Sequence, residues 1–299
     1  MICLDEEQVR ALLRFDDLIP AMERALADFS SGRWQQPVRS VLAVPEYDGL
    51  WGVMPAVCGD VFGVKVVTVY EANAARGLPT HQANIELFRS CNGEPLAVMD
   101  GRLITELRTA AVTAAATRLL ARPDAHSLAI LGSGVQARAH AQALRLVRQF
   151  DDIRLWSRTP EHAQRCAEEI GAKAMSAEDA VRDADVVVAV TYSDKPILRG
   201  AWLAPGALVA AVGAIGLGKR ELDDDAMDAT VVVDSRAAAV KESGDIVYSG
   251  AAVHSELGEL LAGTQPLPPP GRRVVFKSLG LAVEDVGAAK LVWDRYRAT

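Results

Sequence analysis

The residues with the clearest chemical signature are two glycines and an alanine that follow an apolar run. Residues 127–131 are Ser-Leu-Ala-Ile-Leu, and Gly132, Gly134 and Ala137 follow at the spacing G-x-G-x-x-A. In this pattern the first glycine permits a tight turn, the second admits a pyrophosphate and the alanine lets a helix pack closely on the strand. Free N–H groups at the start of such a helix attract phosphate. The segment therefore predicts a dinucleotide-binding site; the alternative is an ordinary turn in another α/β protein.

The end of the next apolar run, residues 153–156, bears on which dinucleotide would bind. An NAD site usually places an acid there for the ribose 2′-hydroxyl, whereas an NADP site offers arginine and small hydroxyl groups. This chain has Ser157, Arg158 and Thr159 and no acid. Because a guanidinium pairs well with a phosphate, we predict NADP(H) as the cofactor. The alternative is that Arg158 is an exposed loop arginine.

Three basic residues of the first third are candidates for holding an anionic substrate: Arg39, Lys65 and Arg108. Lys65 lies within the apolar run 63–67, where an unpartnered lysine would be costly to bury. Two or three such cations that converge would bind a carboxylate. Taken singly, each is more simply explained as a solvated surface charge.

The elements that must position these residues change in type along the chain. Helical spacing over residues 18–29 precedes alternating segments at 40–44, 51–54, 64–70, 83–88 and 95–99, and Asn92-Gly93 predicts a hairpin. An alanine-rich helix is expected over 105–120. Short apolar runs at 128–131, 153–156, 186–190, 208–212 and 231–233 then alternate with polar stretches, which predicts a parallel sheet with crossover helices. We expect a surface connector at 266–270, a helix start at 221–225 and an amphipathic helix over 283–297 that folds back on the first domain.

Composition narrows the class of protein. The 299 residues are 50% hydrophobic and 24% charged, with a net charge of −7, which is ordinary for a globular protein and gives no basic face for nucleic acid. The four cysteines are far apart and no histidine has metal-ligand spacing, so we expect reduced thiols and no metal site. No signal peptide or membrane span is apparent, and we expect a cytoplasmic protein.

Short motifs in the same order along nearly the whole chain resemble the ornithine cyclodeaminase/mu-crystallin family, and its NADPH-dependent ketimine reductases most closely. The motifs that carry the resemblance are Gln36-Pro37-Val38-Arg39, Gly52-Val53-Met54-Pro55 and residues 79–83, 96–101, 108–111, 132–137, 220–224, 241–245 and 276–280. The resemblance implies an α/β fold with a Rossmann domain (119–275) inserted in a discontinuous α+β substrate and dimerisation domain (1–118, completed by 276–299).

The resemblance also implies roles for single residues. It assigns Arg39, Lys65 and Arg108 to the substrate carboxylate, with Lys65 and Arg108 catalytic, and adds Met54 and His81 to the substrate side. His81 is either a proton donor or, more simply, a hydrogen-bonded structural histidine. The cofactor residues implied are Thr109, Gly132, Ser133, Gly134, Val135, Gln136, Ser157, Arg158, Thr159, Thr191, Val212 and Gly213.

Two departures from the family pattern bear on the reaction. Cyclodeaminases carry an Asp soon after the strand that ends at 212–213, where this chain has Ile215, and a Glu before the Met-Pro pair, where it has Gly52 and Val53. Without those carboxylates the expulsion of ammonia lacks its acid/base group. Asp224 would weaken this argument if it reached the same place.

The expected function is therefore NADPH-dependent reduction of ketimines of 2-oxo acids to L-amino acids by a homodimer. Cyclic ketimines such as piperideine-2-carboxylate and pyrroline-2-carboxylate are the expected substrates, and N-alkyl imines are a further possibility. The alternatives are alanine-dehydrogenase-like reductive amination or imino-acid reduction, ornithine cyclodeamination, and an NADPH-regulated small-ligand-binding protein. No nucleic-acid or membrane partner is expected.

Overall fold

The computed structural model describes residues 1–298 of the chain and divides it into two compact units. Unit 1 consists of Met1–Arg108 and Gly280–Thr299, and unit 2 of Thr109–Leu279. The first unit is therefore discontinuous and the second is inserted in it. The sequence placed the boundaries at 118/119 and 275/276, whereas the units change over at 108/109, inside a helix, and at 279/280.

Unit 1 is built on a six-stranded sheet in the order β1-β6-β5-β4-β3-β2. β1 is parallel to β6, and the other neighbours are antiparallel. Alternation of buried and exposed side chains along β3 and β4 fixes which face each residue occupies. The strands are β1 (Ile2–Leu4), β2 (Ser40–Val44), β3 (Gly49–Cys58), β4 (Val61–Tyr70), β5 (His81–Arg89) and β6 (Pro95–Asp100).

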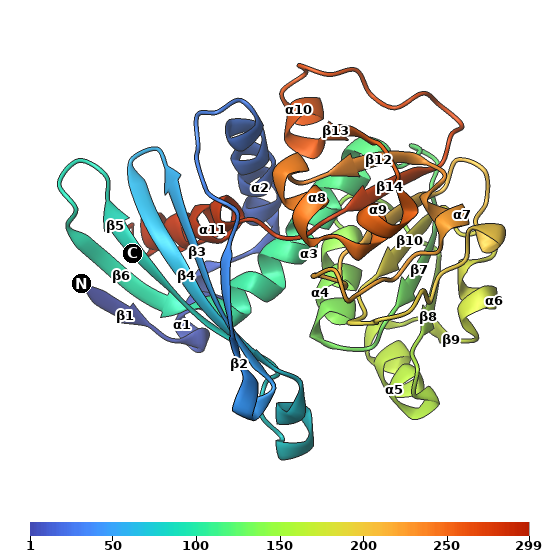
Figure 1. The fold of residues 1–299 in the computed structure, drawn as a ribbon, viewed down its shortest axis with the longest axis horizontal. Coiled ribbons are helices and arrows are strands. Elements are labelled where there is room, and N and C mark those ends of the chain that lie inside the picture. Colours follow the sequence, from blue (N-terminus) through green and yellow to red (C-terminus); the bar gives the residue numbers. More distant parts are fainter. Residues whose placement is uncertain (299) are drawn as a thin grey trace. The chain divides into compact units, whose positions relative to one another are not determined.

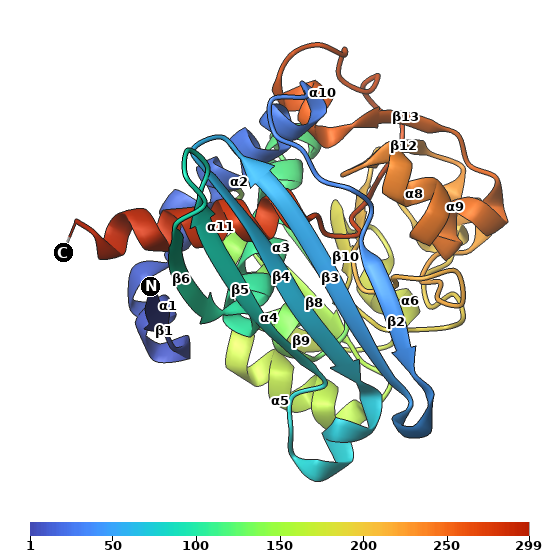
Figure 2. The ribbon, with the colours of Figure 1, turned by 60° about the vertical axis from the view of Figure 1, so that its left-hand side comes forward.

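Helices cover one face of this sheet, as Figure 2 shows for α2 and α11. α11 (Ala282–Tyr296) packs on β3, β4 and β5 and against α2 (Phe15–Ser30), and α1 (Glu6–Leu12) contacts β6. The predicted C-terminal helix is confirmed in this position. Short 3₁₀ helices follow β2 and β4, at η1 (Pro45–Tyr47) and η2 (Glu71–Arg76).

The opposite face of the sheet carries exposed apolar side chains. Trp51 and Val57 of β3, Val66 of β4 and Leu42 of β2 are 39%, 49%, 36% and 59% exposed. No helix of unit 1 covers this face within residues 1–298 (Figure 2). Such a continuous apolar sheet face is typical of an interaction surface.

Unit 2 is a Rossmann-like α/β unit with an eight-stranded parallel sheet in the order β13-β12-β14-β11-β10-β7-β8-β9 (Figure 1). The central strands are buried on both faces, as expected when crossover connections pack on a parallel sheet. Its strands are β7 (Ser127–Leu131), β8 (Asp152–Trp156), β9 (Lys173–Ala174), β10 (Val186–Ala189), β11 (Leu208–Ala211), β12 (Thr230–Val233), β13 (Val253–Glu256) and β14 (Val274–Lys277).

One long helix leads into this unit, and shorter helices connect its strands. α3 (Gly101–Leu120) enters the unit at Thr109, and its alanines at 110, 111, 114, 115 and 116 are fully buried. The others are α4 (Val135–Leu144), α5 (Pro160–Ile170), α6 (Ala177–Val181), η3 (Gly200–Trp202), α7 (Asp224–Met227), α8 (Arg236–Glu242), α9 (Gly244–Ser249) and α10 (Leu257–Leu261).

The predicted strands are confirmed, mostly with longer bounds, and the connector at 266–270 is largely exposed loop. Four strands were not predicted: β1, β9, β13 and β14. β9 is only two residues long, and β1 and β14 have three and four. Their pairing partners, rather than their own sequence, define them.

Candidate active site

Apart from Thr109, which lies on α3, the predicted cofactor residues of unit 2 follow the carboxyl ends of four neighbouring strands. Gly132–Gln136 follow β7, Ser157–Thr159 follow β8, Thr191 lies just after β10 and Val212-Gly213 follow β11. In this sheet β7 and β10 are neighbours, and the connections run to opposite sides from there. That switch point is where open parallel sheets bind ligands.

Gly132 makes the turn between β7 and α4. Its φ of +132° is one that residues with a Cβ rarely adopt, and a Cβ there would lie 2.9 Å from the Val190 carbonyl oxygen. The Gly132 N–H donates to the Trp156 carbonyl at 2.8 Å, which ties the ends of β7 and β8 together. The turn therefore requires glycine, as the motif predicted.

The start of α4 is open and suits a phosphate. Gly134 is its N-cap residue, is exposed and has no atom within 4 Å of where a Cβ would stand. Val135, the first helical residue, is 53% exposed. N–H groups at such a helix start and the partial positive charge of the helix attract an anion. These residues fit the pyrophosphate of a dinucleotide.

Hydroxyl and guanidinium groups lie beside this turn. The Ser133 hydroxyl donates to the Ser157 hydroxyl at 2.8 Å, and Arg138 donates to the Ser133 carbonyl at 2.9 Å. Arg158 is exposed and forms no ion pair with any residue from 1 to 298. An exposed arginine that follows Ser157 is able to pair with a phosphate group.

Glu221 lies at the carboxyl edge of this sheet, and its role differs from the one that we predicted from the sequence. We expected the run 221–225 to begin a helix, and Asp223 does cap α7 by accepting the Ala226 N–H. Glu221 instead is fully buried and accepts four hydrogen bonds: from the Thr191 N–H (2.6 Å) and hydroxyl (2.7 Å), the Gly213 N–H (2.9 Å) and the Ala214 N–H (3.2 Å). One carboxylate thus joins the loops that follow β10 and β11.

A buried ion pair supports Glu221 from behind. Asp245 accepts the N–H groups of Glu221 and Leu222, both at 2.9 Å, and Lys277 lies 2.9 Å from Asp245 and donates to the Ala214 carbonyl at 2.7 Å. Burial raises the pKa of Glu221 above 4.5, while Lys277 and the Thr191 donors act in the opposite direction. Four donors to two oxygens match the ionised carboxylate.

The three predicted substrate cations lie in unit 1, and two of them share one buried carboxylate. The Lys65 ammonium is 2.5 Å from Asp285 Oδ2, and Arg108 Nε donates to Asp285 Oδ1 at 2.8 Å. Arg108 Nη1 also donates to Glu284 at 2.7 Å. All four side chains are at least 95% buried. These contacts bring together β4, α3 and the first turn of α11.

Arg39 reaches the same segment through Gly280. Arg39 Nη2 donates to the Gly280 carbonyl at 2.6 Å, and its Nη1 is 4.0 Å from the sulfur of Met54. A Cβ on Gly280 would lie 2.7 Å from Arg108 Nη1, and its φ is +76°. Glycine at this position therefore lets Arg39 and Arg108 approach the same backbone unit.

We call this group the cationic cluster (Arg39, Lys65, Arg108, Glu284 and Asp285). Burial lowers the pKa of Lys65 to about 8, with Asp285 opposing and Arg108 reinforcing the shift. For Asp285, burial favours the neutral acid, yet Arg108 and Lys65 hold the carboxyl pKa below 3.8.

His81 lies at the start of β5 and is partly buried. Burial, together with the charges of Lys65 and Arg108, lowers its pKa to about 4. The imidazole is therefore neutral at pH 7 and has no imidazolium proton to give. This favours the structural interpretation of His81 over the proton donor.

The sequence did not indicate Glu284 and Asp285, because their partners are 176 and 177 residues away in the chain. A usable signal did exist. The two adjacent acids fall in the first turn of a helix whose first eight residues are all buried. Buried acids need cationic partners.

Ile215 and Asp224, the residues compared above with the cyclodeaminase aspartate, are not part of the cationic cluster. Ile215 packs against the apolar core of unit 2. Asp224 is 73% exposed and pairs with Arg220 at the start of α7.

Within residues 1–298 no three His, Cys, Asp or Glu side chains are grouped to hold a metal, and none of the helices there is long and apolar enough to cross a membrane.

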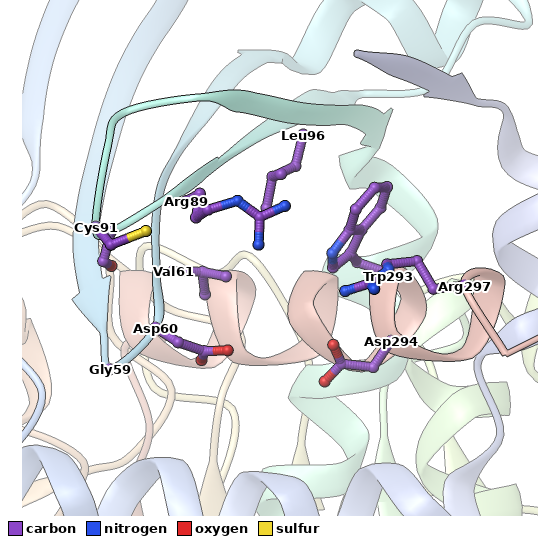
Figure 3. Close-up of a pocket in the computed structure, with 10 residues that line it drawn as sticks. Gly59, Asp60, Val61, Arg89, Cys91, Leu96, Trp293, Asp294 and Arg297 are labelled. Carbon is purple, nitrogen blue, oxygen red and sulfur yellow. The ribbon is translucent and has the colours of Figure 1, made fainter.

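A separate cavity of about 400 Å³ lies at the other end of the sheet of unit 1 (Figure 3). Arg89, Cys91, Trp293 and Arg297 are among its lining residues, and Figure 3 shows them around the opening between β5 and α11. Arg89 already pairs with Glu94 at 2.8 Å. None of the predicted site residues lines it, so the cavity is distinct from the cationic cluster.

A Rossmann-like unit with a dinucleotide site at its switch point is typical of nicotinamide-dependent oxidoreductases. The chain belongs to the ornithine cyclodeaminase/mu-crystallin family, whose model matches residues 1–299. It is 46% identical to ketimine reductase mu-crystallin of Mus musculus, over 98% of this chain and 96% of the relative. It is 33% identical to delta(1)-pyrroline-2-carboxylate reductase of Bacillus cereus, over 99% of this chain and 96% of the relative.

Solved structures share the whole fold. The delta(1)-pyrroline-2-carboxylate reductase of Thermococcus litoralis, in complex with NADH and L-proline, matches with a TM-score of 0.95 and 32% identity, over 100% of this chain and 98% of that one. An archaeal alanine dehydrogenase dimer with bound NAD matches with a TM-score of 0.93 and 32% identity, over 99% of this chain and 96% of that one. The named relatives are thus reductases of C=N bonds and an amino-acid dehydrogenase.

Proposed function

We propose that this protein reduces ketimines of 2-oxo acids to L-amino acids with NADPH. The observation that carries the proposal is the cationic cluster, in which Lys65 and Arg108 share Asp285 and Arg39 reaches the nearby Gly280 carbonyl. Three cations held at one place would bind a substrate carboxylate. The similarity to ketimine and pyrroline-2-carboxylate reductases supports a cyclic imine as the remainder of the substrate.

The cofactor in this proposal is NADP(H), held by unit 2. Gly132–Gln136 would hold the pyrophosphate, and Ser157, Arg158 and Thr159 the 2′-phosphate. Thr191 and Gly213, which donate to Glu221, would hold the nicotinamide end together with Val212 and Thr109. When bound, NADPH supplies the hydride for the imine carbon. The two solved relatives carry NADH and NAD, so the choice of NADPH rests on Arg158 and the missing acid.

The residues of unit 1 bind and orient the substrate. Arg108 and Arg39 would hold its carboxylate, Met54 would contact its ring, and Lys65 would give a proton to the nitrogen as the imine becomes an amine. Substrate residue Arg108 and cofactor residue Thr109 are consecutive, one on each side of the boundary between the units. Orientation of the two reactants is the main catalytic task, because the carbon of a C=N bond accepts hydride readily once the nitrogen can take a proton from Lys65.

Reductive amination is the second candidate, because an alanine dehydrogenase of Archaeoglobus fulgidus is 33% identical over 98% of this chain. Cyclodeamination is disfavoured by Ile215 and by the exposed position of Asp224. One assay separates the candidates: NADPH oxidation with piperideine-2-carboxylate, with pyrroline-2-carboxylate and with pyruvate plus ammonia. We expect turnover of a cyclic ketimine. Turnover only with pyruvate and ammonia would replace the proposal by reductive amination. Turnover under none of the three conditions would leave a ligand-binding role.

We further propose a homodimer that covers the exposed apolar face of β2, β3 and β4. The similarity to an alanine dehydrogenase dimer supports it. A cytoplasmic location is also part of the proposal, because all four cysteines are free thiols.

A further inference from the structure

Lys65 and Arg108 share the carboxylate of Asp285. Its Oδ2 faces the Lys65 ammonium at 2.5 Å and its Oδ1 accepts from Arg108 Nε at 2.8 Å. The side chain is fully buried in the first turn of α11. Because a carboxylate is planar and its two oxygens are a fixed distance apart, binding both cations fixes the ammonium relative to the guanidinium.

Glu284, the preceding residue, offers an internal comparison. It is equally buried and also binds Arg108, at 2.7 Å, and it accepts the Leu281 N–H at the start of α11, at 3.0 Å. Lys65 is paired with Asp285 and lies 3.4 Å from the Thr105 hydroxyl. Both adjacent acids thus bind Arg108, and Asp285 also contacts Lys65.

We propose that Asp285 is a positioning residue that holds Lys65 as the proton donor while Arg108 holds the substrate carboxylate. This rests on the function proposed above. As hydride adds to the imine carbon, the C=N π electrons become a lone pair on nitrogen, and that pair takes a proton from Lys65 Nζ. The N–H bond of Lys65 breaks, the N–H bond of the amine forms, and solvent later returns the proton to Lys65.

The charged and titratable groups around Lys65 come from four parts of unit 1. Asp285 and Glu284 lie on α11, Arg108 on α3, His81 on β5 and Arg39 before β2. Asp285 is the member of this set that favours the charged ammonium by direct contact. His81 is already neutral well below the pH at which Lys65 titrates, since its pKa is about 4 and that of Lys65 about 8. Removal of the Asp285 charge should therefore make Lys65 lose its proton at lower pH.

The test compares Asp285→Asn with Glu284→Gln in the full-length protein. The pH dependence of kcat/KM is measured with NADPH and a cyclic ketimine. In parallel, binding of pyrrole-2-carboxylate without cofactor is titrated by calorimetry, because this planar acid has no group that titrates between about pH 6 and pH 10. We expect Asp285→Asn to move the high-pH loss of both activity and binding down by at least about one unit and to lower kcat. Glu284→Gln should weaken binding and leave that pH midpoint in place.

Equal shifts in the two variants, or no shift in Asp285→Asn, would overturn the inference. If Asp285→Asn does not fold, Asp285→Glu decides instead: it keeps the charge and displaces it, so the midpoint should stay while kcat falls roughly tenfold or more. An unchanged kcat in Asp285→Glu would contradict positioning. A wild-type protein that turns over no ketimine would refute the proposed function, whereas the cofactor-free binding titration would still report on Lys65 and Asp285.

Discussion

Two groups of buried charges in this protein each contain a carboxylate that several donors share. Asp285 serves Lys65 and Arg108, and Glu221 serves the loops after β10 and β11. Removing one partner of such a group is costly, because the other remains buried without its counter-charge. Single substitutions at these places should therefore have effects far larger than those of surface charges.

Arg108 shows this at the scale of one side chain. Arg108→Lys keeps the positive charge but loses the planar guanidinium that contacts Glu284 and Asp285 through different nitrogens. We expect kcat/KM for a ketimine acid to fall roughly 10- to 100-fold, the effect of about 1.5–3 kcal/mol for a lost charged hydrogen bond. Steady-state kinetics measures it. A kcat/KM within twofold of wild type would show that the guanidinium geometry is not used.

Arg158 is the residue that should distinguish the two dinucleotides. In Arg158→Ala we expect the KM for NADPH to rise roughly tenfold or more while the KM for NADH changes little, because only NADPH has a phosphate for this side chain. Arg165→Ala, which removes another exposed arginine of unit 2, is the matched control. Equal changes for both dinucleotides would rule out a contact with the 2′-phosphate.

At the scale of elements, the loops at the carboxyl edge depend on one another through Glu221. The strands β10 and β11 end before Thr191 and Gly213, and each loop gives N–H groups to the same carboxylate. Neither loop has a strand partner at that point. Their relative position is thus set by a side chain from a third segment.

Glu221→Gln should disturb both loops together. A glutamine would turn an NH2 group toward backbone N–H donors that need an acceptor, which costs on the order of 1–3 kcal/mol per unsatisfied group. We expect a lower melting temperature and a Kd for NADPH that rises at least about tenfold. Asp224→Asn, an exposed acid of the adjacent helix, should leave both values unchanged. Weaker NADPH binding in Asp224→Asn as well would attribute the effect to the region rather than to Glu221.

At the scale of the whole molecule, each unit contains a histidine that folding keeps neutral. His140 in unit 2 is fully buried, donates from Nδ1 to the Gln136 carbonyl at 2.8 Å and lies 3.0 Å from the Thr113 hydroxyl. Burial lowers the pKa of His140 to about 4, and that of His81 in unit 1 also falls to about 4.

The pH dependence of stability follows from these values. Between pH 6.5 and about 4 the unfolded chain binds protons that the folded protein excludes, so this contribution is complete above pH 6.5 and is lost as the pH falls toward 4. We expect the free energy of unfolding to drop across that window. His140→Gln should make the slope shallower, whereas His162→Gln, at an exposed position, should not. Denaturant titrations at a series of pH values measure the slope, and an unchanged slope in His140→Gln would contradict the assignment.

The apolar sheet face is also a property of the whole molecule. We expect a mass twice that of the 32.0 kDa chain in solution, and a monomer for Val66→Asp, which places a charge in the middle of that face. Val240→Asp, at an exposed valine of unit 2, should remain dimeric. Light scattering after gel filtration gives the masses. A monomeric wild type, or a dimeric Val66→Asp, would move the interface elsewhere or remove it.

Local patterns were enough to predict much of the fold, because the strands of unit 2 are continuous apolar runs and Gly132 and Gly134 carry a specific turn chemistry. They did not predict β14, whose four residues are paired on both sides by β11 and β12. They also did not predict Asp285, since its role depends on Arg108 and Lys65, which only the tertiary fold brings close. The same applies to Glu221, whose sequence neighbours suggested a helix cap.

The central claim is that a substrate carboxylate completes the cationic cluster while a C=N bond is reduced. The most direct measurement compares kcat/KM for piperideine-2-carboxylate with that for 1-piperideine, the same ring without the carboxylate, at saturating NADPH. We predict a preference for the acid of roughly 100-fold or more, equivalent to about 3 kcal/mol, as expected for a lost charge-assisted pair. Equal turnover of the two rings, or turnover of neither, would contradict it.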